Sequence, residues 1–406
     1  MGSVATVPGS APRAVHAQLA DGRRLTAADI SLSTGLPRST VVHALKRLAE
    51  AGEVEQHAPG RRGRGRPSHT WSVVTPPGPV AVVVAGAHGT TLGVVSAEGR
   101  VLASVETDPL EEVTDGRAAA PALESLDRLL SEAQVTPADL SMAVIGLPGP
   151  SDFSSDAGSR TDNRGSSGHL RRFRTWDGQP PTALLGRHLG CRVYGENDAN
   201  LAALGEALTG AGVGRSTVLG VGLAHGTGAG LVIDGRLHRG RSGLAGEIGH
   251  LHTDDHGRLC HCGARGCFWH TRSVPALLQA LADAHGTSFS VEDVARGAAE
   301  DDHGVVRALL GFGDALGRRL ADAVVFIDPD AIVIDGSLGA ASHVIVDGVQ
   351  DAIRRYAPPT MARGVEVLAG TLGTAAVLVG AAALARSEGL FVRRDPDRNR
   401  VGRANS

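Results

Sequence analysis

The stretch Gly243-Leu244-Ala245-Gly246-Glu247-Ile248-Gly249-His250 is followed, after nine intervening residues, by Cys260-His261-Cys262-Gly263-Ala264-Arg265-Gly266-Cys267. Together they contain the pattern H-x9-C-x-C-x4-C. Thiolates and imidazole around a tetrahedral centre are the donors that Zn²⁺ prefers, and four protein donors leave no coordination position open. We therefore predict a structural zinc held by His250, Cys260, Cys262 and Cys267, which would clamp the loop at residues 247–267.

The donors of this predicted site have alternatives. The neighbouring histidines that could replace His250 as the nitrogen ligand are His252, His256, His261 and His270. Free cysteines in a loop are another interpretation, although the tight spacing and the glycine-rich turn at residues 263–266 favour a metal. The chain has four cysteines, and only Cys191 lies outside the cluster. This clustering is typical of a metal site in a reducing cytosol rather than of a disulfide framework.

The N-terminus shows no charged-then-apolar signal pattern. The most apolar late stretch, residues 371–385, is too short for a membrane span and is rich in Gly and Ala, so we predict a tightly packed helix there. We expect a cytoplasmic protein with no membrane partner.

The stretch Pro76-Pro77-Gly78-Pro79 separates two regions of different composition, and two consecutive prolines cannot continue a helix. We place a linker at residues 76–79, a first domain at residues 1–75 and a second domain at residues 80–387. Residues 151–175 are polar and irregular, as is the tail at residues 388–406, which we predict to be disordered.

The first domain has the element order of a winged helix-turn-helix. Helices are predicted at residues 11–20, 26–33 and 38–51, followed by an extended segment that begins at Val54 and a returning strand at residues 69–74. In the third helix, the apolar side chains predicted to share one face are Val41, Val42, Leu45 and Leu48.

Charge is distributed unevenly between the two domains. Residues 1–75 contain ten basic and five acidic side chains, although the whole chain has a formal charge of −3. A basic head on an acidic body indicates a polyanionic partner, so we predict that the third helix enters the major groove of double-stranded DNA and that an arginine-rich wing tip follows the minor groove. The predicted DNA-contacting residues are Arg38, Ser39, Thr40, His43, Lys46, Arg47, Arg61, Arg62, Arg64 and Arg66. The alternatives are a solvated basic surface and a winged helix used for protein contact.

The second domain is predicted to be an α/β fold in two lobes. The predicted strands are residues 80–85, 91–96, 101–105, 140–146, 192–194, 217–223, 230–233 and 331–335. The predicted helices are residues 123–133, 199–209, 314–326 and 372–384. A glycine-rich loop at residues 219–230 lies between two of these strands. Such loops cradle phosphates with backbone N–H groups, although a plain hairpin loop is the alternative.

The second domain closely resembles the ROK family (repressors, open reading frames, kinases). The resemblance is carried by the stretch that ends at His250, by Glu196-Asn197-Asp198-Ala199-Asn200, by the cysteine cluster and by the glycine-rich loop. It covers roughly residues 80–387. The winged helix-turn-helix of the first domain, with its stretch Gly63-Arg64-Gly65-Arg66-Pro67, is similar to that of the family's regulator branch. The resemblance implies an actin-like ATPase fold in two lobes, with a sugar bound in the cleft.

The resemblance also implies site residues. Asn197, Asp198, Glu247 and His250 would contact sugar hydroxyls, and His250 would serve both the zinc and the sugar. Asp198 matches the residue that acts as the general base in the family's kinases. Side-chain amides and carboxylates suit this role, because a site that pairs every hydroxyl discriminates strongly.

The chain departs from the kinase pattern at several positions. The kinases end their first strand with an Asp followed by a Gly-Gly-Thr turn, whereas this chain has Val84-Ala85-Gly86-Ala87-His88, without a carboxylate for metal or phosphate chemistry. They carry a Glu two residues after the last cysteine, where this chain has Trp269. The segment around residues 171–176 also differs from their sugar-contacting loop. We therefore expect no enzymatic activity.

The sequence thus predicts a homodimeric or homotetrameric DNA-binding regulator of carbohydrate-related genes, a repressor with an activator as the alternative, with a structural zinc and a sugar or sugar derivative as effector. Two other functions remain open. One is an ATP-dependent sugar kinase, for which Asp198 and the glycine-rich loop argue. The other is an effector-independent regulator whose second domain is only a scaffold.

Overall fold

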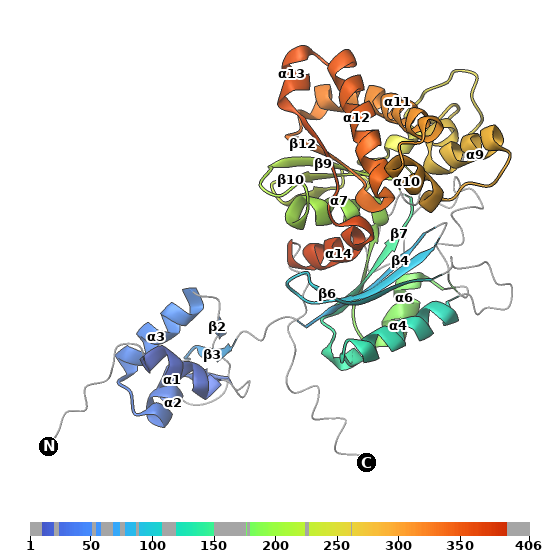
Figure 1. Ribbon diagram of the computed structural model, residues 1–406. Coiled ribbons are helices and arrows are strands. Elements are labelled where there is room, and N and C mark those ends of the chain that lie inside the picture. The colour runs from blue at the N-terminus through green and yellow to red at the C-terminus, as the bar shows by residue number, and fades with distance from the viewer. Residues whose placement is uncertain are drawn as a thin grey trace. The chain divides into compact units, whose positions relative to one another are not determined.

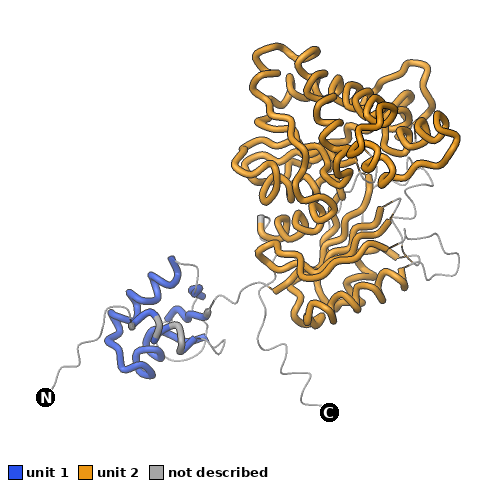
Figure 2. The backbone as a smooth tube through the Cα atoms, in the orientation of Figure 1, with its two compact units in different colours: residues 1–77, 393–406 blue, residues 78–392 orange. Residues whose placement is uncertain are grey.

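The structure is a computed structural model, and it describes residues 10–19, 24–50, 54–57, 68–73, 78–86, 89–107, 119–149, 176, 179–223, 227–260 and 262–387. The chain divides into two compact units, one of residues 1–77 with 393–406 and the other of residues 78–392 (Figure 2). The predicted wing-tip arginines (Arg61, Arg62, Arg64 and Arg66), the predicted irregular segment at residues 151–175 and the predicted disordered tail lie outside the described residues.

The first unit is a winged helix-turn-helix (Figure 1). Its elements are α1 (Ser10–Leu19), β1 (Leu25–Thr26), α2 (Ala27–Thr34), α3 (Arg38–Glu50), β2 (Val54–His57) and β3 (Thr70–Val73). The strands form a sheet in the order β1-β3-β2, in which β2 and β3 are antiparallel and Val54 lies opposite Val73. The three predicted helices and the returning strand are confirmed with small shifts at their ends, whereas the short strand β1 was not predicted.

Short-range contacts set both ends of α2. The Thr26 hydroxyl accepts from the Asp29 backbone N–H at 3.2 Å, and the Asp29 carboxylate accepts from the Thr26 backbone N–H at 2.9 Å. This reciprocal capping box satisfies two N–H groups that the helix itself leaves unpaired. Gly35 follows α2 with a φ of +69°, and its N–H donates to the Ser31 carbonyl. A left-handed glycine at this place ends the helix and turns the chain toward α3.

One apolar core holds the first unit together. Its buried residues are Val15, Leu19, Ile30, Val41, Ala44, Leu45, Leu48 and Val54. The prediction that Val42 shares the buried face of α3 is wrong, because its side chain is 39% exposed. Successive helix residues are rotated by about 100°, so Val42 lies to one side of the face that carries Val41 and Leu48.

The second unit contains two five-stranded sheets. The first, in the order β6-β5-β4-β7-β8, consists of β4 (Val80–Ala85), β5 (Thr90–Val95), β6 (Val101–Thr107), β7 (Met142–Leu147) and β8 (Val193–Asn197). The second, in the order β11-β10-β9-β12-β13, consists of β9 (Thr217–Gly222), β10 (Gly228–Ile233), β11 (Arg236–His238), β12 (Ala331–Ile334) and β13 (Glu366–Ala369). Each sheet is the centre of one lobe, as the sequence predicts.

Helices cover both faces of the two sheets. They are α4 (Ala120–Glu132), α6 (Pro181–Leu189), α7 (Asp198–Thr209), α8 (Trp269–Arg272), α9 (Val274–His285), α10 (Val291–Ala299), α11 (His303–Ile327), α12 (Ala340–Tyr356), α13 (Pro359–Gly364) and α14 (Ala376–Ser387). Short 3-10 turns are η1 (Pro137–Asp139), η2 (Ile248–His250), η3 (Gly336–Leu338) and η4 (Gly373–Ala375). In Figure 1, α4 and α6 cover the outer face of the first sheet, α7 and α14 lie between the sheets, and α11 and α12 cover the outer face of the second sheet.

Strand β4 is buried on both faces. Val80 and Val82 pack with α7 and α14, whereas Ala81 and Val83 pack with α4 and α6. Side chains alternate between the two faces of a strand, so a strand covered on both sides is apolar at every position. This explains the uninterrupted apolar run at residues 80–85.

Helices α7 and α14 cross closely because glycines lie at their contact. A Cβ atom on Gly380 would lie 1.8 Å from the Leu201 carbonyl oxygen, and one on Gly205 would lie 2.3 Å from the Ala376 carbonyl oxygen. The prediction of a tightly packed helix within residues 371–385 is confirmed. In the described part of the chain, no helix is long and apolar enough to cross a membrane.

Several helices of the second unit have no counterpart among the predictions. The helix predicted at residues 314–326 is the second half of α11, which begins at His303 after the capping residue Asp302. Helices α9, α10 and α12 were not predicted. They surround the outer face of the second sheet and supply much of its apolar core.

Candidate metal centre and interlobe site

A cluster of four metal-binding side chains lies in the loop that precedes α8. One ligand atom from each of His250, Cys260, Cys262 and Cys267 lies within 4.8 Å of all the others. The His250 Nδ1 atom is 3.6 Å from the Cys260 Sγ atom, and the Cys262 and Cys267 Sγ atoms are also 3.6 Å apart. Among the described histidines of this region, His250 joins the cluster, whereas His252, His256 and His270 do not.

Glycines allow the loop to bring these atoms together. Gly263 has a φ of +91°, and its N–H donates to the Cys260 carbonyl. Gly266 has a φ of +68°, and a Cβ atom there would lie 1.8 Å from the Asp254 carbonyl oxygen. Residues with a side chain rarely adopt such angles, so the two glycines are a steric requirement of this turn.

The donor set fits a soft divalent cation. Burial, followed by the neighbouring thiols of Cys262 and Cys260, raises the pKa of Cys267 to about 12. Burial, followed by the charge of His270, lowers the pKa of His250 and so favours its neutral imidazole. A neutral imidazole and crowded thiols that lose their protons to a cation are the donors of tetrahedral structural sites. These four residues therefore form a cluster that could hold a metal ion.

A polar site lies against this cluster. Glu247 precedes η2, and its Oε2 atom is 3.9 Å from the His250 Nε2 atom. Burial, followed by the charge of Asp198, raises the pKa of Glu247 to about 7. His250 thus faces the cysteines with one ring nitrogen and Glu247 with the other. The structure thus brings together Asp198, Glu247 and His250, three of the residues for which the resemblance to ROK proteins implies sugar contacts.

Asn197 has a structural part in the same site. It is the N-cap of α7, its Oδ1 atom accepts from the Asn200 backbone N–H at 3.0 Å, and its Nδ2 atom donates to the Gly149 carbonyl at 3.0 Å. These contacts place Asp198 at the first position of α7. Trp269, which replaces the kinases' glutamate, begins α8 beside η2 and is partly buried.

An ion pair connects the two lobes next to this site, and the sequence did not reveal it. Glu196 lies in β8 of the first sheet, and Arg239 follows β11 of the second sheet. The Arg239 Nε atom donates to the Glu196 Oε2 atom at 2.8 Å. The Glu196 Oε1 atom accepts from the Asn197 backbone N–H at 2.8 Å and from the Asn200 side chain at 3.0 Å. The available signal in the sequence was the position of Glu196 in the motif at residues 196–200. Nothing in the sequence around Glu196 indicates that Arg239 is its partner.

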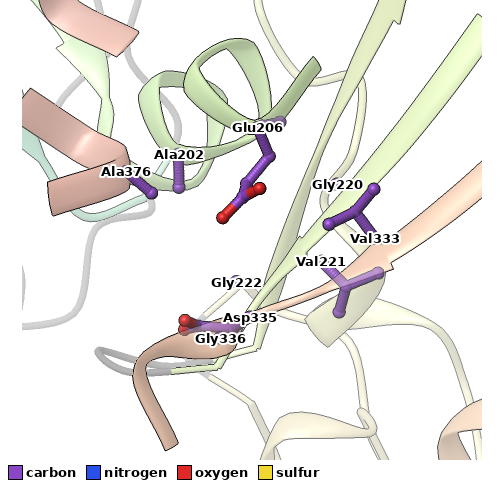
Figure 3. A pocket seen from close by; sticks show the side chains of 10 residues that line it. Ala202, Glu206, Gly220, Val221, Gly222, Val333, Asp335, Gly336 and Ala376 are labelled. Atoms are coloured by element: carbon purple, nitrogen blue, oxygen red, sulfur yellow. The ribbon is translucent and has the colours of Figure 1, made fainter. Parts of the chain in front are cut away.

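A small cavity lies between α7 and the second sheet (Figure 3). Its volume is about 20 Å³, which is enough for roughly one water molecule. The Glu206 carboxylate, which lines it, accepts from the backbone N–H groups of Ala211, Thr371 and Leu372. Glu206 therefore ties α7 to the turn before α14, a structural role that the sequence analysis missed.

Asp335 lines the same cavity at the end of β12. Its Oδ2 atom accepts from the Leu223 backbone N–H at 2.9 Å, and its Oδ1 atom accepts from Ser337 at 2.8 Å. Leu223 follows β9 within the glycine-rich loop, of which residues 224–226 lie outside the described part. A carboxylate of the protein thus occupies one N–H group of the predicted phosphate cradle. In the first lobe, Val84 is fully buried in β4, in the stretch that has no carboxylate.

The predicted DNA-binding residues of α3 lie on one side of the helix. Arg38, Ser39, His43, Lys46 and Arg47 are exposed, and Thr40 is half-buried. The opposite side packs into the core of the first unit. The structure therefore brings these six residues to one solvent-facing surface, which we call the α3 face.

The family model for the ROK family matches residues 80–388. The chain belongs to the ROK family. A second model, the IclR helix-turn-helix domain, matches residues 17–58, which contain α2 and α3. The chain therefore combines a helix-turn-helix with a ROK domain, and the predicted family and fold are both confirmed.

Known relatives include kinases and regulators. A glucokinase of Thermotoga maritima is 28% identical over 313 residues, which cover 73% of this chain and 94% of that protein. The DNA-binding transcriptional repressor Mlc of Escherichia coli is 32% identical over 213 residues, covering 50% of this chain and 52% of Mlc. A solved ROK family transcriptional regulator, a homologue of the E. coli protein, has a TM-score of 0.62 and 22% identity and covers 93% of this chain and 95% of its own. The fold that the chain shares with this solved regulator covers almost the whole chain.

Proposed function

We propose that this protein is a sequence-specific DNA-binding repressor of carbohydrate-related genes, and that a sugar-type effector in its ROK domain controls it. The observation that carries the proposal is the α3 face, a polar and basic helix surface on a helix-turn-helix unit joined to a ROK domain. A recognition helix of this kind places its exposed side chains against base edges and phosphates in the major groove. The wing-tip arginines, Arg61, Arg62, Arg64 and Arg66, would add contacts to the narrow minor groove.

We further propose that the metal is Zn²⁺ and that it is structural. His250 would bind it through Nδ1, and Cys260, Cys262 and Cys267 through their thiolates, which completes a tetrahedral shell. The Nε2 atom of His250 faces Glu247, so the metal would fix the imidazole orientation in the polar site. Metal binding and effector recognition would then share one residue.

The effector would bind where Asp198, Glu247 and His250 meet, beside Asn197. Side-chain carboxylates and amides pair well with the vicinal hydroxyls of a sugar. Glu196, in the first lobe, accepts a hydrogen bond from the Asn197 backbone N–H at the start of α7. Arg239, in the second lobe, donates to the same Glu196 carboxylate. A ligand that prefers one arrangement of the lobes shifts the equilibrium between arrangements by its differential affinity.

Regulation of DNA binding requires paired recognition helices. Winged helices bind two half-sites at a spacing that the symmetry of the protein sets. We therefore propose a homodimer or homotetramer in which lobe closure changes the separation of the two α3 faces.

Footprinting on the promoter region of the protein's own gene, with and without a panel of neutral sugars, tests this function. We expect a protected palindromic site at moderate salt, and one sugar that changes the protection. No protected site would contradict the proposal. A site that no sugar affects would support an effector-independent regulator whose ROK domain is a scaffold.

A second candidate function is an ATP-dependent sugar kinase, favoured by Asp198 at the kinase-base position and by the glucokinase relatives. A kinase also needs groups that hold the phosphates and Mg²⁺. The Asp335 carboxylate, which accepts from the Leu223 backbone N–H of the glycine-rich loop, disfavours an incoming phosphate there. A coupled assay of ADP release over a sugar panel separates the two functions, because sugar-dependent turnover that Asp198→Asn abolishes would establish the kinase.

A further inference from the structure

One apolar side chain lies on the side of α3 that carries the predicted DNA contacts. Val42 is 39% exposed, and it lies three residues after Ser39 and four residues before Lys46. Residues three and four apart are neighbours on a helix surface, so Val42 adjoins both. Among the valines and leucines of α3, all of which the structure describes, Val42 is the one whose side chain does not enter the core.

The buried side of α3 shows where Val42 is directed. Val41, Ala44, Leu45 and Leu48 define the core side of the helix. At about 100° per residue, the opposite side is centred on Ser39 and Lys46. Val42 then lies on the flank of this surface, one helical turn after Arg38. A helix seated in the major groove through Ser39 and Lys46 would bring Val42 to the neighbouring base pair.

The chemistry of the major groove restricts what a valine can recognise. Base edges there present hydrogen-bond donors and acceptors, with one apolar group, the C5-methyl of thymine. An aliphatic side chain gains nothing from a polar edge but removes apolar surface from water when it contacts a methyl group. We propose that Val42 reads the methyl group of a thymine in each half-site of the operator. This inference rests on the proposed function, since it needs α3 in the major groove.

The size of the effect follows from the group removed. Burial of one methylene-sized group changes an affinity by about fourfold. Replacement of thymine by deoxyuridine removes only that methyl group and keeps the base pair. The contact should therefore appear as a roughly fourfold preference for thymine over uracil at one position of each half-site.

The test uses the full-length, metal-loaded protein. Binding sites are first selected from random DNA, and each thymine of the selected site is then replaced singly by deoxyuridine. We expect one position per half-site at which the wild-type protein loses about fourfold in affinity. Val42→Ala should bind the thymine site more weakly by a similar factor and should no longer distinguish thymine from uracil there.

Leu32→Ala is the matched control. Leu32 is an aliphatic side chain on α2 that is 89% exposed, so its removal changes an apolar surface of the same unit outside α3. It should keep the thymine preference. A thymine preference that Val42→Ala retains, or uracil tolerance at every position, would overturn this inference while the proposed function stands. Failure to select any sequence would overturn both.

Discussion

Arg239 and Glu196 join the two lobes through a hydrogen-bonded ion pair, with the Arg239 Nε atom 2.8 Å from the Glu196 Oε2 atom. The Glu196 side chain is 4% exposed, and the Arg239 side chain is 25% exposed. The second oxygen of Glu196 binds the first turn of α7, which carries Asp198. The proposed effector site is therefore held from both lobes by one glutamate.

Glu196→Gln should destabilise the second unit by about 2–4 kcal/mol, because it removes the negative charge from a buried side chain that pairs with the Arg239 guanidinium. Urea unfolding of the full chain would measure this loss. Glu366→Gln is the matched control, since Glu366 also pairs with an arginine, Arg215, but its side chain is 58% exposed. That change should cost less than about 1 kcal/mol. Equal effects of the two substitutions would contradict a structural role for the interlobe pair.

Cys267→Ser should abolish zinc binding and lower the thermal stability of the ROK domain. Metal analysis of the purified protein should give one zinc per chain for the wild type. Cys191→Ser serves as the control. Because Cys191 lies outside the cluster, this variant should bind as much zinc as the wild type. Equal zinc content in both variants would show that the cluster does not bind it.

Zinc binding should also weaken as the pH falls. The pKa of Cys267 in the metal-free cluster is raised to about 12 by burial and by its thiol neighbours, so zinc must displace a proton there. Acidification favours the protonated thiol, and the apparent zinc affinity should rise steadily from pH 6 to pH 8. Competition with a chromophoric chelator over this range gives the slope. A flat profile would mean that thiol deprotonation does not accompany metal binding.

Lys46→Ala should weaken binding to all DNA sequences and should reduce the slope of log affinity against log salt by about one. The reason is that a lysine on the α3 face releases a counterion when it meets a phosphate. Anisotropy titrations at several salt concentrations measure the slope. Arg296→Ala is the control, because Arg296 is exposed on α10 of the other unit. An unchanged slope for Lys46→Ala would place this residue away from the phosphates.

Gly246→Ala should destabilise the ROK domain by about 2 kcal/mol or more. Gly246 has a φ of +91°, and a Cβ atom there would lie 1.8 Å from the Ala229 carbonyl oxygen. Gly311→Ala is the opposite case, because Gly311 lies within α11 with no atom near the new methyl group. It should stabilise the domain by about 0.5–1 kcal/mol. Thermal unfolding of both variants would show whether Gly246→Ala lowers and Gly311→Ala raises the stability of the domain, as expected.

The parts of the fold that the sequence revealed are those with local causes. The spacing of His250 and the cysteines predicted the metal cluster, since a tight turn must bring them together. The apolar run at residues 80–85 predicted β4, because a strand covered on both faces has no polar positions. Arg239 and Glu196 escaped prediction, since their contact depends on how two sheets pack.

The sequence also did not determine which apolar residues of a helix face the core. Val42 follows Val41 in an apolar pair, and the sequence pattern was interpreted as placing both on one face of the helix. The orientation of α3 against α1 decides which of them is buried, and that orientation is a tertiary property. Glu206 is a similar case, because its backbone partners Thr371 and Leu372 are far away in the sequence.

The central claim is that DNA binding by the first unit responds to a sugar in the second. Its most direct test is an anisotropy titration of the full-length, zinc-loaded protein on its selected operator and on scrambled DNA, at physiological salt, across a panel of sugars. We expect the protein to bind the operator at least about 1000-fold more tightly than scrambled DNA. We also expect one sugar to change the operator affinity by about 5- to 150-fold. Equal affinity for both DNAs, or an operator affinity that no sugar alters, would contradict the central claim.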